Sequence, residues 1–362
     1  MKNRIVCTLA MLLALAAISI GCRPKRGHID HIDVVYVAGE EQSAAGTSIA
    51  TLWKNGVPER LTNGNRDARA ESIFVSGDDV YVAGSEDVSG DDDRRKKRIA
   101  ILWKNGKPTR LTDGNSFAMA LSVFVQDGNV YVAGLEYSDA GKSVAMLWKN
   151  GEPTPLGTGK EDDTANSIFV SGGDVYVAGY EQKAGMPRGG LSTAVLWKNG
   201  VLQRLSDANN SMANSVYVSG DDVYVAGHEW NNEEKKIAML WKNGAPQPLG
   251  DGNAFAEAHS VFVAGSDVYV AGQLADTEEG REHAVLWKNG AAQRLSDGYT
   301  DTMAKSVFVL GNNVYVSGHE DVYESHDSTG MKRFATLWKN GKPTRLGEGE
   351  GDAYGTCAIL VK

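Results

Sequence analysis

A seven-fold internal repeat constrains the fold of this chain more than any other feature. The motif VYVAG occurs six times and is followed by one copy of VYVSG, and each copy is followed by the motif LWKNG. The tryptophans of LWKNG are Trp53, Trp103, Trp148, Trp197, Trp241, Trp287 and Trp338, so neighbouring copies are 44 to 51 residues apart. A period of this length is typical of β-propellers and of other repeat arrays.

Within one repeat, apolar and polar residues alternate in short runs rich in β-branched and aromatic types, which predicts strands. In the repeat that begins at Ser167 the runs are SIFV, VYVAGYE, TAVLWK and VLQRL, and we call the corresponding strands a, b, c and d in every repeat. Strands c and d are joined by Asn-Gly in all seven copies, and Asn-Gly supplies the positive φ angles of a tight hairpin turn. Four antiparallel strands repeated seven times predict an all-β, seven-bladed β-propeller.

The two chain ends are expected to complete one blade together. Strand a is found only six times, starting at Ser72, Ser122, Ser167, Ser215, Ser260 and Ser306. The first repeat lacks it, whereas the C-terminal run AILV at 358–361 has the right pattern. We therefore expect the C-terminal strand to join the N-terminal blade and close the ring, which removes the exposed sheet edges of an open array.

The N-terminus has the features of an export signal. A short basic start precedes an apolar run from Ile5 to Ile20, which is short for a membrane span. The residues SIGC at 19–22 resemble the lipobox of bacterial lipoproteins, in which the cysteine is diacylated after cleavage. This resemblance implies a signal peptide at 1–21, lipidation of Cys22 and a tether at 22–32, before a propeller at 33–362. The alternative is an ordinary signal peptide with an incidental Cys22.

The repeats resemble those of bacterial seven-bladed β-propeller lipoproteins, a functionally uncharacterised family. The resemblance covers nearly all of the chain after the tether, and it implies export and a lipid anchor in the bacterial cell envelope. No Asp follows Cys22, and by resemblance to enteric sorting signals this favours the outer membrane.

Charge and cysteine content exclude some classes of function. The formal net charge of −9 argues against nucleic acid, whose binding requires neutralisation of phosphates. Only Cys7, Cys22 and Cys357 are present, so no disulfide framework is expected. We expect no cofactor and no metal, because dinucleotide, P-loop and zinc-hydrolase motifs are absent and His28 and His31 would face opposite sides of an extended tether.

The frame Ala-x-Ser at the start of strand a contains the main candidate site. Its middle residue changes chemistry from repeat to repeat while its neighbours stay constant, and Cys357 takes the corresponding place in the closing strand; the residues are Glu71, Leu121, Asn166, Asn214, His259 and Lys305. Strand a is the innermost strand of a propeller blade, so these side chains can form an asymmetric ring at the mouth of the channel. The alternative is an exposed position that drifts freely.

Aromatic residues near the b to c loops form a second candidate site. Trp230 is the one tryptophan outside the repeated position, and Tyr137, Tyr180 and Tyr323 are placed similarly. We expect them in loops, where exposed rings suit sugar stacking or protein contact. The alternative for Trp230 is packing on its own loop.

The remaining repeated side chains are expected to be structural. The tryptophans and the tyrosines of VYV should pack between adjacent sheets. A glutamate ends strand b in six repeats, at Glu41, Glu86, Glu136, Glu181, Glu229 and Glu320. We expect these glutamates to form local salt bridges, for which an arginine of strand d is available in most repeats; a cation site or acid–base chemistry is the alternative.

The function expected from these features is binding. The leading hypothesis is a monomeric, envelope-anchored scaffold that recognises a protein or a polysaccharide through its loop-rich face. One alternative is a carbohydrate hydrolase or lyase that uses channel-mouth residues such as Glu71, His259 and Lys305. Another is a purely structural envelope component, because a propeller fold by itself assigns no chemistry.

Overall fold

The computed structural model describes residues 34–88, 97–182, 191–207, 210–250, 252, 254–275, 280–296, 298, 300–323, 331–346 and 352–361. Val34–Val361 form one compact unit. The predicted signal peptide, Cys22 and the tether with His28 and His31 lie outside the described residues. No helix within the described ranges is long and apolar enough to cross a membrane.

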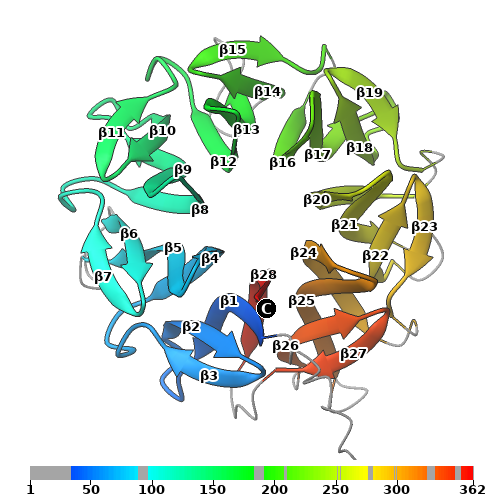
Figure 1. Cartoon of the computed structure of the whole chain (residues 1–362), viewed down its shortest axis with the longest axis horizontal. Helices are drawn as coiled ribbons and strands as arrows, with labels where there is room; N and C mark the ends of the chain where they lie inside the picture. Colours follow the sequence, from blue (N-terminus) through cyan, green and yellow to red (C-terminus); the bar gives the residue numbers. More distant parts are fainter. Residues whose placement is uncertain are drawn as a thin grey trace, which may run out of the picture. The chain divides into compact units, whose positions relative to one another are not determined.

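The fold of the unit is the predicted seven-bladed β-propeller, as Figure 1 shows. Each blade is a four-stranded antiparallel sheet whose strands run a, b, c, d from the centre outward. The first blade is β28 (Ala353–Val361), β1 (Val34–Gln42), β2 (Ser48–Lys54) and β3 (Val57–Arg60). The second is β4 (Ala68–Ser76), β5 (Asp79–Asp87), β6 (Arg98–Lys104) and β7 (Lys107–Arg110). The third is β8 (Ala118–Gln126), β9 (Asn129–Tyr137), β10 (Ser143–Lys149) and β11 (Glu152–Pro155).

The other four blades repeat this order along the chain. The fourth is β12 (Asp163–Ser171), β13 (Asp174–Gln182), β14 (Ser192–Lys198) and β15 (Val201–Arg204). The fifth is β16 (Ser211–Ser219), β17 (Asp222–Trp230), β18 (Lys236–Lys242) and β19 (Ala245–Pro248). The sixth is β20 (Ala256–Ala264), β21 (Asp267–Ala275), β22 (Glu282–Lys288) and β23 (Ala291–Arg294). The seventh is β24 (Asp301–Leu310), β25 (Asn313–Tyr323), β26 (Met331–Lys339) and β27 (Lys342–Arg345).

The two ends of the chain close the ring as predicted. β28 pairs antiparallel with β1, from Val34 opposite Val361 to Glu41 opposite Ala353. The pairing is therefore longer than the run AILV, and the amide of Gln42 extends it by donating to the carbonyl of Asp352 at 2.7 Å. The first blade thus has the same four strands as the other six.

The Asn-Gly turns explain why both residues recur. In all seven copies the asparagine has a φ between 51° and 53° and the glycine is also at positive φ, as a type I′ turn requires. The asparagine also accepts a hydrogen bond from the amide of the second residue of strand b, as from Val80 to Asn105 Oδ1 at 2.8 Å. The same bond is present in every blade. One side chain therefore fixes both the turn and the start of the neighbouring strand.

The core lies between adjacent blades. The seven repeated tryptophans are at most 2 % exposed. One core cluster joins Tyr81 of the second blade to Trp148 of the third, and equivalent clusters join the other blades around the ring. This confirms that the repeated Trp and Tyr pack between sheets, where large rings contribute most of the buried apolar area.

The repeated serine of strand a joins the inner strands to one another. Each inner strand is the edge of its sheet, so its channel-side amides have no ladder partner. The hydroxyl of Ser72 accepts the amide of Val123 in the next blade at 3.1 Å, and four further blades repeat this bond. Two residues after each serine, an aromatic ring contacts its neighbour at 4.7 to 4.9 Å, giving a belt of Phe74, Phe124, Phe169, Tyr217, Phe262 and Phe308.

The glycine of VYVAG is required by close backbone contact. A Cβ on Gly84 would lie 1.9 Å from the carbonyl oxygen of Arg69 in strand a. In the third to seventh blades a Cβ on the equivalent glycine would lie 1.8 to 2.0 Å from the corresponding carbonyl oxygen. Since real Cβ atoms do not approach this closely, no other residue fits without displacing the inner strand.

Removal of residues 357–362 should destabilise the propeller strongly, because it opens the ladder between β28 and β1. We expect the melting temperature to fall by roughly 10 °C or more, the equivalent of several kcal/mol for a domain of this size. Deletion of Lys362 alone, which lies outside β28, is the control. An unchanged melting temperature in the longer deletion would refute ring closure.

Substitution of Gly84 by Ala should cost roughly 3 kcal/mol or more through overpacking, visible as a fall of about 6 °C or more in melting temperature. Gly250→Ala is the matched control, because nothing lies within 4 Å of a Cβ at Gly250 and its φ is not positive. Equal effects of the two substitutions would show that the close contact at Gly84 is unimportant.

Candidate functional site

The variable residue of Ala-x-Ser is the extra residue of a β-bulge. In the second blade Ala70 pairs with Gly84 and Ser72 with Ala83, so Glu71 has no partner across the sheet. The same register shift occurs at Leu121, Asn166, Asn214, His259 and Lys305. A bulge redirects its side chain out of the regular alternation and is common next to functional sites. The constant frame is therefore what holds a bulge at the inner edge of every blade.

The closing strand has its bulge one residue earlier than the sequence suggested. Ala38 pairs with Cys357 and Gly39 with Gly355, which leaves Thr356 as the extra residue. The expectation that Cys357 takes the variable place is therefore wrong. Cys357 stands opposite the alanine of VYVAG, where the other blades have serine. The reason is that Gly355 and Cys357 replace the Ala and Ser of the frame. The closing strand therefore has no Ala-x-Ser sequence from which the position of the bulge could be read.

A pocket of about 370 Å³ is lined in part by residues of β4 and β24, the inner strands on either side of β28 in Figure 1. Residues from the first, second, sixth and seventh blades line it, including Glu40, Glu71, Glu282, Lys305 and His319. We call this pocket the mouth pocket. It contains two of the predicted site residues, Glu71 and Lys305.

Two ion pairs form part of the wall of the mouth pocket. Arg69 Nε lies 3.1 Å from Glu40 Oε2 and joins the second blade to the first. Arg333 of β26 binds both carboxylate oxygens of Asp321 on β25. These four charged groups compensate one another, so they supply hydrogen-bonding surface rather than free charge.

Glu71 and Lys305 are different, because neither side chain forms a hydrogen bond or ion pair with any part of the chain that the structure describes. Burial raises the pKa of the Glu71 carboxyl, against the effect of Arg69. Burial also lowers the pKa of the Lys305 ammonium, against the carboxylates of Glu257, Glu71 and Glu282. The closed ring thus holds an acid and a base in one pocket and shifts both toward their neutral forms.

His259 belongs to a neighbouring cluster of charged and polar groups, in which its Nε2 has no hydrogen-bond partner among the described residues. At its centre Glu257 accepts Lys236 Nζ at 2.7 Å and Asn214 Nδ2 at 3.3 Å, and His228 Nδ1 lies 3.2 Å away. Burial alone would raise the pKa of Glu257, but His228, His259 and Lys236 hold it well below its usual range. Burial and the charge of Lys305 lower the pKa of His259 to about 3, so its ring is neutral.

The other predicted residues have structural contacts. Asn166 Nδ2 donates to the carbonyl of Ala213 at 2.9 Å, and Asn214 Nδ2 donates to that of Ala258 at 2.9 Å. Each asparagine therefore ties its bulge to the next blade. The expectation that Trp230 lies in a loop is wrong: Trp230 is the last residue of β17 and packs edge-on against Phe255 of the next blade, at 6.1 Å between ring centroids.

The predicted tyrosines also lie in strands. Tyr137 ends β9 and packs against Phe117 at 5.1 Å, Tyr180 lies within β13, and Tyr323 ends β25. The strands simply extend further than the alternating pattern indicated, because pairing between b and c continues past the glutamate.

The predicted salt bridges of the repeated glutamates are present in three blades. Arg60 Nε lies 3.7 Å from Glu41, Arg204 Nη2 lies 2.5 Å from Glu181, and Arg345 Nε lies 3.0 Å from Glu320. In the third blade, where Pro155 replaces the arginine, Ser116 Oγ donates to Glu136 at 3.0 Å. The local structural role is confirmed for these four glutamates.

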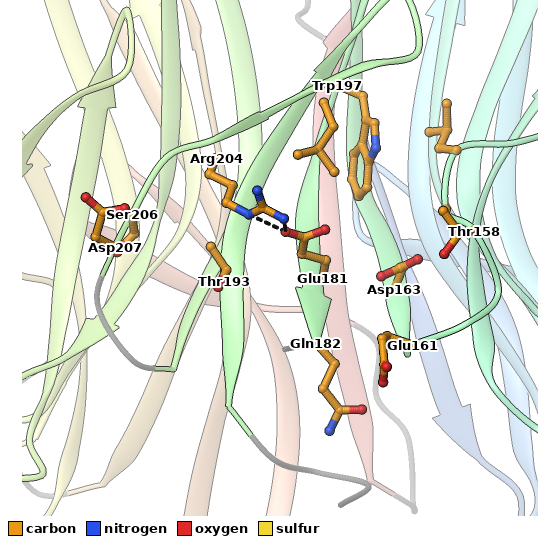
Figure 2. A pocket seen from close by; sticks show the side chains of 13 residues that line it. Thr158, Glu161, Asp163, Glu181, Gln182, Thr193, Trp197, Arg204, Ser206 and Asp207 are labelled. Carbon is orange, nitrogen blue, oxygen red and sulfur yellow. Dashed lines mark hydrogen bonds and ion pairs between the residues drawn. The ribbon is translucent and has the colours of Figure 1, made fainter. Parts of the chain in front are cut away.

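One buried acid, Asp163, was not among the residues predicted from the sequence. Asp163 begins β12 directly opposite Glu181 and is 6 % exposed. Burial, followed by the charge of Glu181, raises its pKa to about 7. Asp163 and Glu181 line a second pocket, of about 430 Å³, which Figure 2 shows. The signal was in the alignment of the repeats, because the other blades have Ala68, Ala118, Ser211, Ala256, Thr302 and Ala353 at this place.

Comparisons with known proteins give only a general likeness. No family model and no curated protein matches the chain. Among solved structures, an acylaminoacyl peptidase of Pyrococcus horikoshii matches at 14 % identity and a TM-score of 0.49, over 87 % of this chain and 50 % of that chain. A puromycin-hydrolyzing peptidase of Mycobacterium tuberculosis matches at 14 % identity and a TM-score of 0.48, over 77 % of this chain and 53 % of that chain. This chain thus spans about half of each, and similarity at this level assigns no activity.

No group of three or more His, Cys, Asp or Glu side chains within the described ranges is arranged to hold a metal ion.

The raised pKa of Asp163 predicts a pH-dependent stability cost. The folded-state pKa of about 7 lies above the ordinary value of 3.8, so ionisation of Asp163 opposes folding. The cost grows as the pH rises from about 4 to about 7 and is constant above that. Asp163→Asn should therefore stabilise the protein by about 2–4 kcal/mol at pH 8 and by much less at pH 4, as measured by urea unfolding.

The matched control for this measurement is Asp174→Asn. Hydrogen bonds from Lys198 and Asn199 lower the pKa of Asp174, so its removal should not stabilise the protein at pH 8. A stabilisation by Asp163→Asn that is the same at pH 4 and pH 8 would contradict the assignment of a raised pKa to Asp163.

Proposed function

We propose that the protein is an envelope-anchored binding scaffold whose mouth pocket holds an acidic polysaccharide. The observation that carries the proposal is the Lys305 ammonium, which lines the pocket and has no ion pair among the described residues. The Lys305 side chain is half-buried, and a cation partly withdrawn from water without a carboxylate in direct contact carries a desolvation cost. A ligand carboxylate would remove that cost by pairing with Lys305.

Glu71 fits the same ligand. Because burial raises its pKa, the neutral carboxyl is favoured, and a neutral carboxyl donates a hydrogen bond. A ligand carboxylate can thus accept one bond from Lys305 and one from protonated Glu71. Charge-assisted hydrogen bonds of this kind are the strong ones in recognition.

The rest of the pocket favours a sugar over a peptide. Its wall is composed mainly of charged and hydroxyl groups, such as Arg69, Glu40, Asp301 and Thr302, with Met303 and Ala70 as the apolar contributions among the described residues. Protein interfaces usually bury aromatic and aliphatic anchors at their centre. A dense set of donors and acceptors is better matched to the hydroxyls of a sugar chain.

The predicted lipid on Cys22 supports the location of this activity. A chain anchored after residue 21 would carry the propeller at the membrane surface, next to envelope polysaccharides. The proposal therefore keeps the envelope address inferred from the sequence, with the outer membrane favoured.

Titration calorimetry of the mature protein with a trimer of galacturonic acid tests the proposal, with a neutral galactose trimer as the comparison. We expect the acidic trimer to bind at least about tenfold more tightly, and Lys305→Met to remove that preference, as loss of one charge-assisted bond requires. Leu121→Asn is the control, because it introduces asparagine, which the fourth and fifth blades have at their bulge, at a bulge position outside the mouth pocket. Equal affinity for both trimers, or unchanged binding in Lys305→Met, would contradict the proposal.

A second candidate, a lyase acting on the same class of polysaccharide, is favoured by the opposite pKa shifts of Glu71 and Lys305. An acid and a base brought toward neutrality in one pocket are a frequent arrangement for proton transfer. In such a reaction the Lys305 amine would remove the C5 proton next to the uronate carboxylate, and Glu71 would bind that carboxylate. The C4–O glycosidic bond would break as the C4=C5 double bond forms, and the leaving oxygen would take its proton from the Lys305 ammonium. Formation of the unsaturated product by the wild type, absent in Lys305→Met, distinguishes turnover from binding alone.

A further inference from the structure

The second pocket lies in the fourth blade, apart from the mouth pocket, and has its own chemistry. It is formed by the start of β12 and by β13, β14 and β15, together with the crossovers that enter from the third blade and leave toward the fifth. Figure 2 shows Glu181 between Asp163 on one side and Arg204 on the other, with Trp197 above the two acids. We call this space the blade-four pocket.

The two acids of the blade-four pocket are not equally compensated. Glu181 Oε1 accepts Arg204 Nε and Nη2, both at 2.5 Å. Asp163 faces Glu181 across the sheet and receives the backbone amide of Thr158. No side-chain cation within the described ranges pairs with Asp163. It is a buried carboxyl that faces a cavity of about 430 Å³ and has no counter-ion among the residues that the structure describes.

Asp163 is the change from the repeat pattern that builds this arrangement, and a nearby glycine leaves room for it. In the first two crossovers Thr62 and Thr112 bind the amides of Ala50 and Ala100. The third crossover has the same length but has Gly157 at this place. A Cβ on Gly157 would lie 2.1 Å from Asp163 Oδ2. The carboxylate thus occupies space that a threonine fills in the first two crossovers. Glycine at this place is not peculiar to the third crossover, because Gly250 takes it in the fifth, which leads to Ala256. The aspartate is the residue that sets the fourth blade apart.

The surrounding charges keep the blade-four pocket negative. Glu161 and Asp207 also line it. Lys142, in the loop between β9 and β10, does not reach Asp163, because it pairs with Asp162 at 3.2 Å and Glu161 at 3.8 Å. Since Arg204 is bound to Glu181, no cation of the described part of the chain pairs with Asp163.

The pocket also has an apolar wall. Leu156, Trp197 and Leu202 line it, and Leu202 is 36 % exposed at its outer side. An apolar wall beside a buried carboxylate suits a cation on an alkyl stem better than a hydrated ion. We propose that the blade-four pocket binds a primary ammonium group on a short alkyl chain, with the ammonium on Asp163 and the chain against Trp197 and Leu202.

Binding of this ligand is linked to a proton. The charged groups that face Asp163 are Glu181 on β13, Glu161 and Asp162 on the crossover, and Arg204 through its bond to Glu181. With a pKa of about 7 for Asp163, the carboxylate that the ammonium requires is scarce at pH 6 and dominant at pH 8. An alkylammonium stays charged over this range, so the affinity should rise about tenfold between these two pH values.

The test is titration calorimetry of the full mature chain with two probes, at pH 6 and pH 8 and constant ionic strength. The first probe is 1,5-diaminopentane, which represents a free amine. The second is Nα-acetyl-lysine amide, which represents a lysine of a protein partner. Tight binding of the first alone identifies a small-molecule amine as the ligand. Tight binding of the second identifies a protein lysine.

The variants are chosen from the protein's own repeats. Gly157→Thr with Asp163→Ala restores the pair found in the first two crossovers, so the blade should remain folded while the site is lost. Asp163→Asn keeps the shape and removes the charge. We expect both to weaken binding of the better probe at pH 8 by about tenfold or more, with far-UV circular dichroism unchanged.

Three results would overturn the proposal. One is unchanged affinity in Asp163→Asn, and another is an affinity that is equal at pH 6 and pH 8. The third is that neither amine binds at pH 8. If calcium chloride then binds with a heat that Asp163→Asn abolishes, the pocket is a metal site and not an ammonium site.

Discussion

The pairing of β28 with β1 is the interaction on which the rest of the structure depends. Every blade buries its tryptophan against a neighbour, so an open array would leave one face of the first and last blades exposed. Closure also brings the second, first, seventh and sixth blades into one arc. The mouth pocket is built from residues of all four. It therefore exists only when residues more than 300 positions apart in the chain are paired.

Repetition within the chain separates residues that maintain the blade from residues that give the molecule its specificity. The serine, the glycine, the Asn-Gly turn and the tryptophan recur because each satisfies the same contact in each blade. The bulge then places one additional side chain per blade at the inner edge, on a residue that has no partner in strand b. Asparagine at this place is used to tie blades together. Glu71 and Lys305, at the same place in their blades, form no such contact within the described residues. The proposed ligand is the one that would pair with these two side chains.

Much of the fold could be predicted from the sequence, because the alternating pattern of the strands and the Asn-Gly turns are local signals. The absence of strand a from the first repeat could be read from the same patterns. The contacts of the site were less accessible. The bulge in β28 was misplaced since Gly355 and Cys357 replace the usual frame. Trp230 was placed in a loop because the length of a ladder depends on its partner strand. Asp163 was not predicted because its environment is built by residues outside its own strand. The glycine lies in the preceding crossover and the glutamate on the adjacent strand, so the pattern of β12 alone does not reveal them.

The most direct test of the central claim is amide hydrogen exchange of the intact chain, followed by mass spectrometry. Peptides that cover β28 (Ala353–Val361) are compared with peptides that cover the equivalent inner strand β24 (Asp301–Leu310). Closure predicts that the amides of β28 that bond to β1 exchange as slowly as those of β24, which bond to β25. Exchange of β28 within seconds, with β24 still protected, would show that the ring is open and would remove the basis for the mouth pocket.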